Sequence, residues 1–106
     1  MRKITNREEF DSVVNSGNIC LKFGAEWCSP CIALAELIEG TEGNYNGVTF
    51  VEVDVDEFDD DSIFDEYKIK NIPVLYFIKD GLISNKTVGL ISSDDFNNYL
   101  SKMINS

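Results

Sequence analysis

Two cysteines separated by two residues, in the segment 27–31 (Trp-Cys-Ser-Pro-Cys), constrain this chain more than any other feature. The pair lies where an apolar strand pattern, residues 19–23, gives way to a helical pattern. Two intervening residues let both sulfurs meet across the first turn of a helix, where unpaired backbone N–H groups and the positive end of the helix dipole stabilise a thiolate. The sequence therefore predicts a dithiol that forms and breaks a disulfide, with Cys28 as the nucleophile.

The length and composition are those of one globular domain, which we expect to span residues 1–106. The first residues turn polar and acidic without a signal peptide pattern, and no later segment is apolar enough to span a bilayer, so we expect a cytoplasmic protein. The net charge of −10, with no histidine, repels nucleic acid and anionic membranes. We therefore expect neither as a partner.

A metal site is the competing interpretation of the cysteines. Structural zinc normally needs four ligands from cysteine or histidine, and this chain has three cysteines and no histidine. Cys20 falls inside the first buried strand, where a thiol usually behaves as a small apolar side chain. The acidic segment 54–61 lacks the glycine required at the sixth position of a calcium-binding loop, so an acidic helix start is the simpler interpretation. We expect no metal.

Helical and strand patterns alternate along the chain. Helical patterns cover residues 7 to about 17, 30 to about 40, about 59 to 67, and about 92 to 104, and strand patterns cover about 19–23, 48–55, 74–78 and 82–88. Asp80-Gly81 marks a hairpin turn between the last two strands. The predicted fold class is α/β, with a central mixed sheet that has a parallel centre and an antiparallel hairpin edge, flanked by helices on both faces.

Three motifs give the chain a resemblance to the thioredoxin family. They are the segment 25–31, Ile72-Pro73 ahead of a strand, and Asp80-Gly81 followed by Val88-Gly89. Their order and spacing match the family along essentially the whole chain, which is far more specific than a lone CxxC. The resemblance implies a thioredoxin fold and a protein-disulfide reductase or electron carrier.

The resemblance also implies roles for residues around the dithiol. Pro73 is expected to follow a cis peptide bond beside the cysteines, and cis bonds are essentially confined to X-Pro sites. Trp27, Ile72 and Gly89 are expected to form a shallow apolar groove for the backbone of the target. Pro30 limits the motion of the loop between the cysteines. Ser29 stands where the family most often has glycine, and either tunes the redox potential or is simply tolerated.

In the expected reaction the Cys28 thiolate attacks a target disulfide, and Cys31 then displaces the reduced target from the mixed disulfide. Cys28 is expected to be accessible and Cys31 to be buried behind it. The resemblance implies that a flavoprotein thioredoxin reductase recharges the dithiol. The chain itself is expected to be a monomer without a bound cofactor, so that NADPH and FAD act only through that reductase.

The strongest departure from the family pattern is a reversal of charge. Thioredoxins commonly carry aspartate at the position matching Lys22 and lysine at the one matching Glu52. A swap at both positions predicts that Lys22 and Glu52 touch, because an unpaired buried charge costs more than a paired one. We expect Lys22 to favour the thiolates, so that Lys22→Leu raises the cysteine pKa values, with Glu52 or water as proton acceptor. The alternative is that Lys22 reaches solvent and pairs with nothing.

Other functions remain open at this point. A non-catalytic binding subunit would use the same groove to hold a partner, although retention of both cysteines argues against it. A specialised carrier for one dedicated reductase or target is a second alternative, because Gly24, Ser29 and Lys22 all depart from the family pattern. A disulfide oxidase or isomerase is a third, and the absent export signal and Pro30 favour a reductase. Glu36 replaces the proline that kinks the second helix of the family, so a straighter helix is expected.

Overall fold

Five strands form one sheet in the computed structural model, which describes residues 1–106. The strands are β1 (Arg2–Lys3), β2 (Asn18–Gly24), β3 (Val48–Asp54), β4 (Val74–Lys79) and β5 (Leu82–Val88), in the spatial order β1-β3-β2-β4-β5. β1 and β2 run parallel to β3, whereas β4 runs antiparallel to β2 and β5 antiparallel to β4. The predicted mixed sheet with an antiparallel hairpin edge is therefore confirmed.

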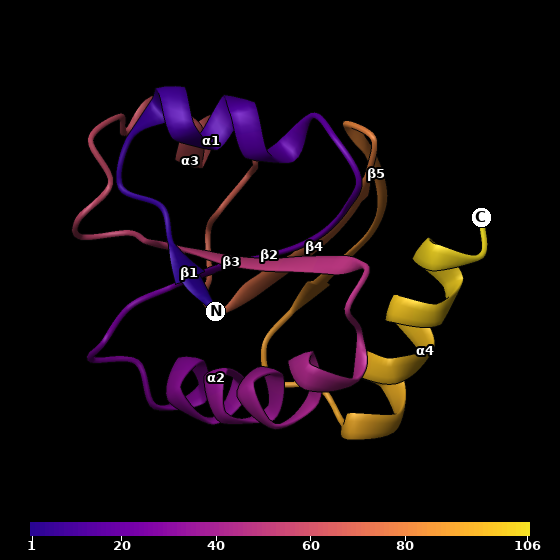
Figure 1. The fold of residues 1–106 in the computed structure, drawn as a ribbon. Coiled ribbons are helices and arrows are strands. Elements are labelled where there is room, and N and C mark those ends of the chain that lie inside the picture. Colours follow the sequence, from indigo (N-terminus) through magenta and orange to yellow (C-terminus); the bar gives the residue numbers. More distant parts are fainter.

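Helices cover both faces of this sheet, as Figure 1 shows. The helices are α1 (Arg7–Val14), α2 (Ser29–Thr41), α3 (Ser62–Glu66) and α4 (Ser93–Ile104), with a 3-10 helix η1 (Glu42–Asn44) after α2. α1 and α3 lie on one face, and α2 and α4 lie on the other. The central strand β2 is therefore buried on both faces from Ile19 to Gly24. None of the helices combines the length and apolar character needed to cross a bilayer.

The two faces of the sheet carry separate hydrophobic cores. The core under α1 and α3 contains a group of packed aromatic rings: the ring of Phe10 lies 5.9 Å from that of Phe58 and 5.3 Å from that of Tyr67, both edge to face. Under α2 and α4 the rings of Phe77 and Phe96 pack together. Cys20 belongs to this second core, as its place in an apolar strand predicts.

Polar side chains at the helix starts fix where the helices begin. The Asn6 side chain accepts a hydrogen bond from the Glu9 N–H at 2.8 Å, and Ser92 does the same for Asp95 at 3.1 Å. The residue capping α2 is Cys28 itself, and Pro30 lies in the first turn of that helix. The redox-active segment is therefore held at the point where β2 has ended and α2 begins.

Some boundaries differ from the sequence prediction. β1 was not predicted, because a two-residue strand has too few residues to show an alternating pattern. α1 ends at Val14, before the predicted stop at Gly17, whose φ of +81° places it in a turn rather than in the helix. α3 begins at Ser62 rather than near residue 59, because the Asp60 carboxylate accepts hydrogen bonds from the backbone N–H and hydroxyl of Ser62 and forms a turn.

Candidate active site

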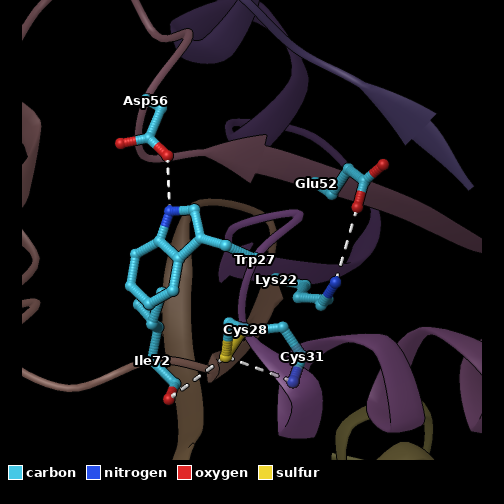
Figure 2. Close-up of a disulfide and its surroundings, with 7 residues drawn as sticks. All are labelled: Lys22, Trp27, Cys28, Cys31, Glu52, Asp56 and Ile72. Atoms are coloured by element: carbon cyan, nitrogen blue, oxygen red, sulfur yellow. Dashed lines mark hydrogen bonds and ion pairs between the residues drawn. A yellow bond between two sulfur atoms is a disulfide. The ribbon is translucent and has the colours of Figure 1, made fainter.

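Cys28 and Cys31 are joined in a disulfide at the start of α2. Their Cα atoms lie 5.2 Å apart, which is within the range that a disulfide spans. The backbone N–H of Cys31 donates to the Sγ of Cys28 at 3.3 Å (Figure 2). This N–H is one of those left unpaired at a helix start, so it faces the sulfur that the sequence identifies as the nucleophile.

Cys28 is more buried than the sequence predicts. In the disulfide form 6% of its surface is exposed, against none for Cys31. The order of exposure is as predicted, but the prediction of an accessible Cys28 was wrong for this state. Ile72 and Val55 pack against the small cluster of Ala25, Cys28 and Cys31 and cover the sulfurs.

A cis peptide bond joins Ile72 to Pro73, as the family resemblance implies. The carbonyl oxygen of Ile72 lies 3.9 Å from the Cys28 Sγ (Figure 2). The carbonyl of Pro73 in turn accepts a hydrogen bond from Gly89 N–H at 2.8 Å. Gly89 has a φ of +87°, which a residue with a side chain rarely adopts. The dithiol segment, the Ile72-Pro73 bend and the turn at Gly89, which are distant in sequence, are therefore connected in the fold.

Trp27 lies beside the dithiol and is 70% exposed. Its indole Nε1–H donates to the Asp56 carboxylate at 2.7 Å, as Figure 2 shows. This hydrogen bond holds a large exposed ring in one orientation. The sequence analysis missed Asp56, because one carboxylate in an acidic segment carries no signal of its own. Ser29 and Pro30, the residues between the cysteines, are both exposed.

Lys22 and Glu52 form the ion pair that the reversed charges predict. They are directly paired residues on the neighbouring strands β2 and β3, and the Lys22 Nζ lies 3.6 Å from the Glu52 Oε2 (Figure 2). Only 6% of the Lys22 side chain is exposed, against 26% of that of Glu52. The alternative in which Lys22 reaches solvent unpaired is therefore wrong, and the outer partner is the carboxylate.

A cavity of about 300 Å³ opens next to this pair. Lys22, Gly24, Glu36 and Glu52 are among the residues that line it. A Cβ atom on Gly24 would lie 3.2 Å from both the Cys31 Sγ and the Lys22 Cε. A side chain at residue 24 would be crowded by these atoms, so glycine lets the lysine and the buried sulfur lie close together, a feature that the sequence analysis did not foresee.

Three carboxylates gather beside this cavity, from Glu26, Asp54 and Glu57, with oxygens within 4.8 Å of one another. The Lys3 Nζ donates to Glu57 at 2.6 Å and lies 3.8 Å from Glu26, so an ammonium supplies positive charge to the group. The hydrogen bond from Lys3 lowers the pKa of Glu57, and the same bond raises the pKa of Lys3.

Cys20 plays no part in this site. It is buried, and burial raises the pKa of its thiol far above the ordinary value, so the group stays protonated. A protonated, inaccessible thiol is a poor nucleophile. The redox chemistry therefore rests on the other two cysteines.

The thioredoxin family model matches residues 2–102 of the chain. The chain belongs to the thioredoxin family. The thioredoxin of Mycoplasmoides gallisepticum is 34% identical over 94% of this chain and 99% of its own length, and that of Chlamydia pneumoniae is 33% identical over 96% and 98%. The solved thioredoxin of Plasmodium falciparum superposes with a TM-score of 0.85 at 26% identity over 96% of this chain and 98% of its own. The solved thioredoxin of Fasciola hepatica superposes with a TM-score of 0.86 at 25% identity, over 97% of this chain and 99% of its own length.

Thioredoxins are disulfide oxidoreductases, and this chain has the redox-active cysteine pair of the family at the start of α2. The activity is dithiol–disulfide exchange, in which two thiols of the protein become the observed disulfide while a disulfide elsewhere is reduced.

Proposed function

We propose that this chain reduces disulfides of other proteins, with Cys28 as attacking and Cys31 as resolving sulfur. The observation that carries the assignment is the place of Cys28 as the cap of α2, where its Sγ accepts the N–H of Cys31. A hydrogen bond to a sulfur at the positive end of a helix favours the thiolate, the only reactive form of a thiol. Cys31 is completely buried and meets a target only after Cys28 has bound it.

The exchange takes two steps. The Cys28 thiolate attacks one sulfur of the target disulfide, a bond forms between the two sulfurs, and the other target sulfur leaves as a thiolate and takes up a proton. Cys31 then loses its proton and attacks the Cys28 sulfur, which releases the second target thiolate and closes the internal disulfide. The target disulfide gains two electrons, and the protein dithiol loses them.

The surrounding residues bind the target in this proposal. The Ile72 carbonyl lies 3.9 Å from the Cys28 sulfur, Gly89 is hydrogen-bonded to the adjoining Pro73, and Trp27 precedes Cys28 in the chain, so an extended target segment placed among these residues would bring its disulfide to Cys28. Ser29 and Pro30 are exposed between the cysteines and would contact the same segment. In this proposal Lys22 and Glu52 do not contact the target and act on the dithiol from the side of the sheet.

The oxidised form needs a source of electrons, and we propose a flavoprotein thioredoxin reductase that uses FAD and NADPH. The family supports this partner, since its members work by returning to the dithiol form after each exchange. In this proposal the chain acts as a monomer in the cytoplasm, where thiols are kept reduced. Migration in gel filtration and cell fractionation test these two points.

The experiment that tests the proposal is NADPH-coupled reduction of insulin disulfides with a thioredoxin reductase. We expect turnover by the native chain and none by Cys28→Ser. Cys20→Ser is the matched control, because it removes a thiol from the core and should keep full activity. Turnover by Cys28→Ser, or its loss in a folded Cys20→Ser protein, would contradict the assignment.

A second experiment separates the two cysteines. Cys31→Ser should accumulate a covalent adduct with a target, because the first bond forms and nothing releases it. Peptide mapping should find the target on Cys28. If the native chain reacts with chemical reductants but not with a generic reductase, the result supports a specialised carrier with a dedicated reductase.

A further inference from the structure

We propose that the Lys22 ammonium stabilises the thiolate of Cys31 during the resolving step, and that Glu52 is a positioning residue that holds and partly offsets this charge. The inference rests on the proposed function, because it assigns a cation to the second of the two sulfurs. The observation behind it is that the buried lysine of the ion pair lies close to the buried sulfur of Cys31.

The position of Lys22 supports this role. A Cβ atom added to Gly24 would lie 3.2 Å from the Cys31 Sγ and 3.2 Å from the Lys22 Cε. The distance between the Sγ and the Cε is therefore at most twice this value. No side chain intervenes, because residue 24 is glycine. Lys22 and Cys31 are both nearly or fully buried, where water screens a charge poorly. A cation in that position favours the thiolate over the thiol.

The position of Glu52 makes it the weaker of the two influences on Cys31. The Glu52 carboxylate lies 3.6 Å from the Lys22 Nζ, and 26% of the Glu52 side chain is exposed, so solvent partly screens the negative charge. Lys22 therefore presents a net positive charge to the sulfur. The cavity of about 300 Å³ is lined by Lys22 and Gly24, the two residues that lie next to the Cys31 sulfur, so the charge of Lys22 lies between this sulfur and solvent.

The step balances without an added reagent. Cys31 gives up its proton to solvent, its thiolate forms a bond with the Cys28 sulfur, and the bond between Cys28 and the target breaks. The target sulfur leaves with the electron pair of that bond and takes up a proton from solvent. Lys22 exchanges no proton in this step and acts only by its charge.

Five other charged residues line the same cavity. They are Lys3 of β1, Glu26 of the loop before α2, Glu36 and Glu39 of α2, and Asp54 of β3. Lys3 is offset by its bonds to Glu57 and Glu26. Glu26, Glu36 and Glu39 are exposed, so solvent screens them. Asp54 is buried but accepts a hydrogen bond from the Asp56 N–H. Of the charged residues that line the cavity, Lys22 is the buried cation, and it lies next to Cys31.

The test follows both steps in one stopped-flow reaction of the reduced protein with excess DTNB across a pH series. Attack by Cys28 releases one coloured thiolate at a rate that rises with DTNB concentration. Displacement by Cys31 releases a second at a rate independent of that concentration. The first phase tests the proposed function, and the second tests the role of Lys22, so the two can fail separately.

Lys22→Met should slow the second phase about tenfold at neutral pH and shift its pH midpoint upward, with the first phase changed much less. Lys22→Arg keeps the charge and should restore the native rate. Glu52→Gln removes the offsetting charge and should speed the second phase. Lys102→Met is the matched control, because it removes a lysine charge from the exposed face of α4 and should change neither phase.

Lys22→Gln, which keeps a polar side chain of similar length but removes the charge, guards against effects of folding. It should slow the second phase as much as Lys22→Met does. If the second phase keeps its native rate and midpoint in Lys22→Met or in Lys22→Gln, the proposal is overturned. A slower second phase that Lys22→Arg also shows would assign the effect to packing and overturn it as well.

Discussion

The Lys22 Nζ lies 3.6 Å from the Glu52 Oε2, between two strands that run side by side in the centre of the sheet. The two ends of this ion pair differ in exposure, since only the carboxylate reaches solvent. Removing the Lys22 charge and removing the Glu52 charge should therefore change the free energy of unfolding by different amounts.

Glu52→Gln should lower the free energy of unfolding by about 1–3 kcal/mol, because it leaves a buried ammonium without its counter-charge. Lys22→Met should change it by less than about 1.5 kcal/mol, since an apolar side chain of similar volume suits the buried position and the freed carboxylate stays partly solvated. Urea unfolding of the oxidised proteins measures both. Equal losses in the two variants would contradict the asymmetry.

Asp56 should control the orientation of Trp27, the only tryptophan of the chain. Asp56→Ala frees the indole N–H, so the ring should become more mobile and its fluorescence anisotropy should fall. The catalytic efficiency with insulin should fall roughly fivefold, the worth of about one hydrogen bond. Asp65→Ala, which removes an exposed carboxylate from α3, is the control. An unchanged anisotropy in Asp56→Ala would show that the indole does not depend on this bond.

The bond between Lys3 and Glu57 should stabilise the fold only within a window of pH. The pKa of Glu57 is lowered from 4.5, so the carboxylate stabilises the folded state above pH 4.5, and this stabilisation is lost as the pH falls through the lowered pKa. The pKa of Lys3 is raised from 10.5, so its contribution is present below that pH and is lost as the pH rises through the raised value.

Glu57→Gln should therefore lower the melting temperature by a constant amount, at most about 5 °C because the pair is exposed, between about pH 5 and pH 10. The difference from the native chain should shrink outside this range. Thermal unfolding followed by circular dichroism across pH measures it, and Lys3→Met should give a similar profile. A difference that persists unchanged at pH 2 would point to packing instead of charge.

Much of this structure could be predicted from the sequence because the patterns behind it are local. Alternating apolar residues and helix starts indicate the main elements, and the reversed charges on two apolar strands indicate that Lys22 and Glu52 touch. The remainder depends on packing between distant segments. β1 forms by pairing with the edge of β3, Asp56 acts through its hydrogen bond to the Trp27 indole, and Cys28 is buried where Ile72 and Val55 pack against its cluster.

The reactivity of Cys28 tests the account most directly. The reduced protein is alkylated with iodoacetamide across a pH series, and the modified residue is identified by mass spectrometry. The account predicts that Cys28 reacts first and that its rate curve has a midpoint at about pH 7, as in other thioredoxins. A midpoint at or above about pH 8.5, the value for an ordinary thiol, or faster modification of Cys31, would contradict it.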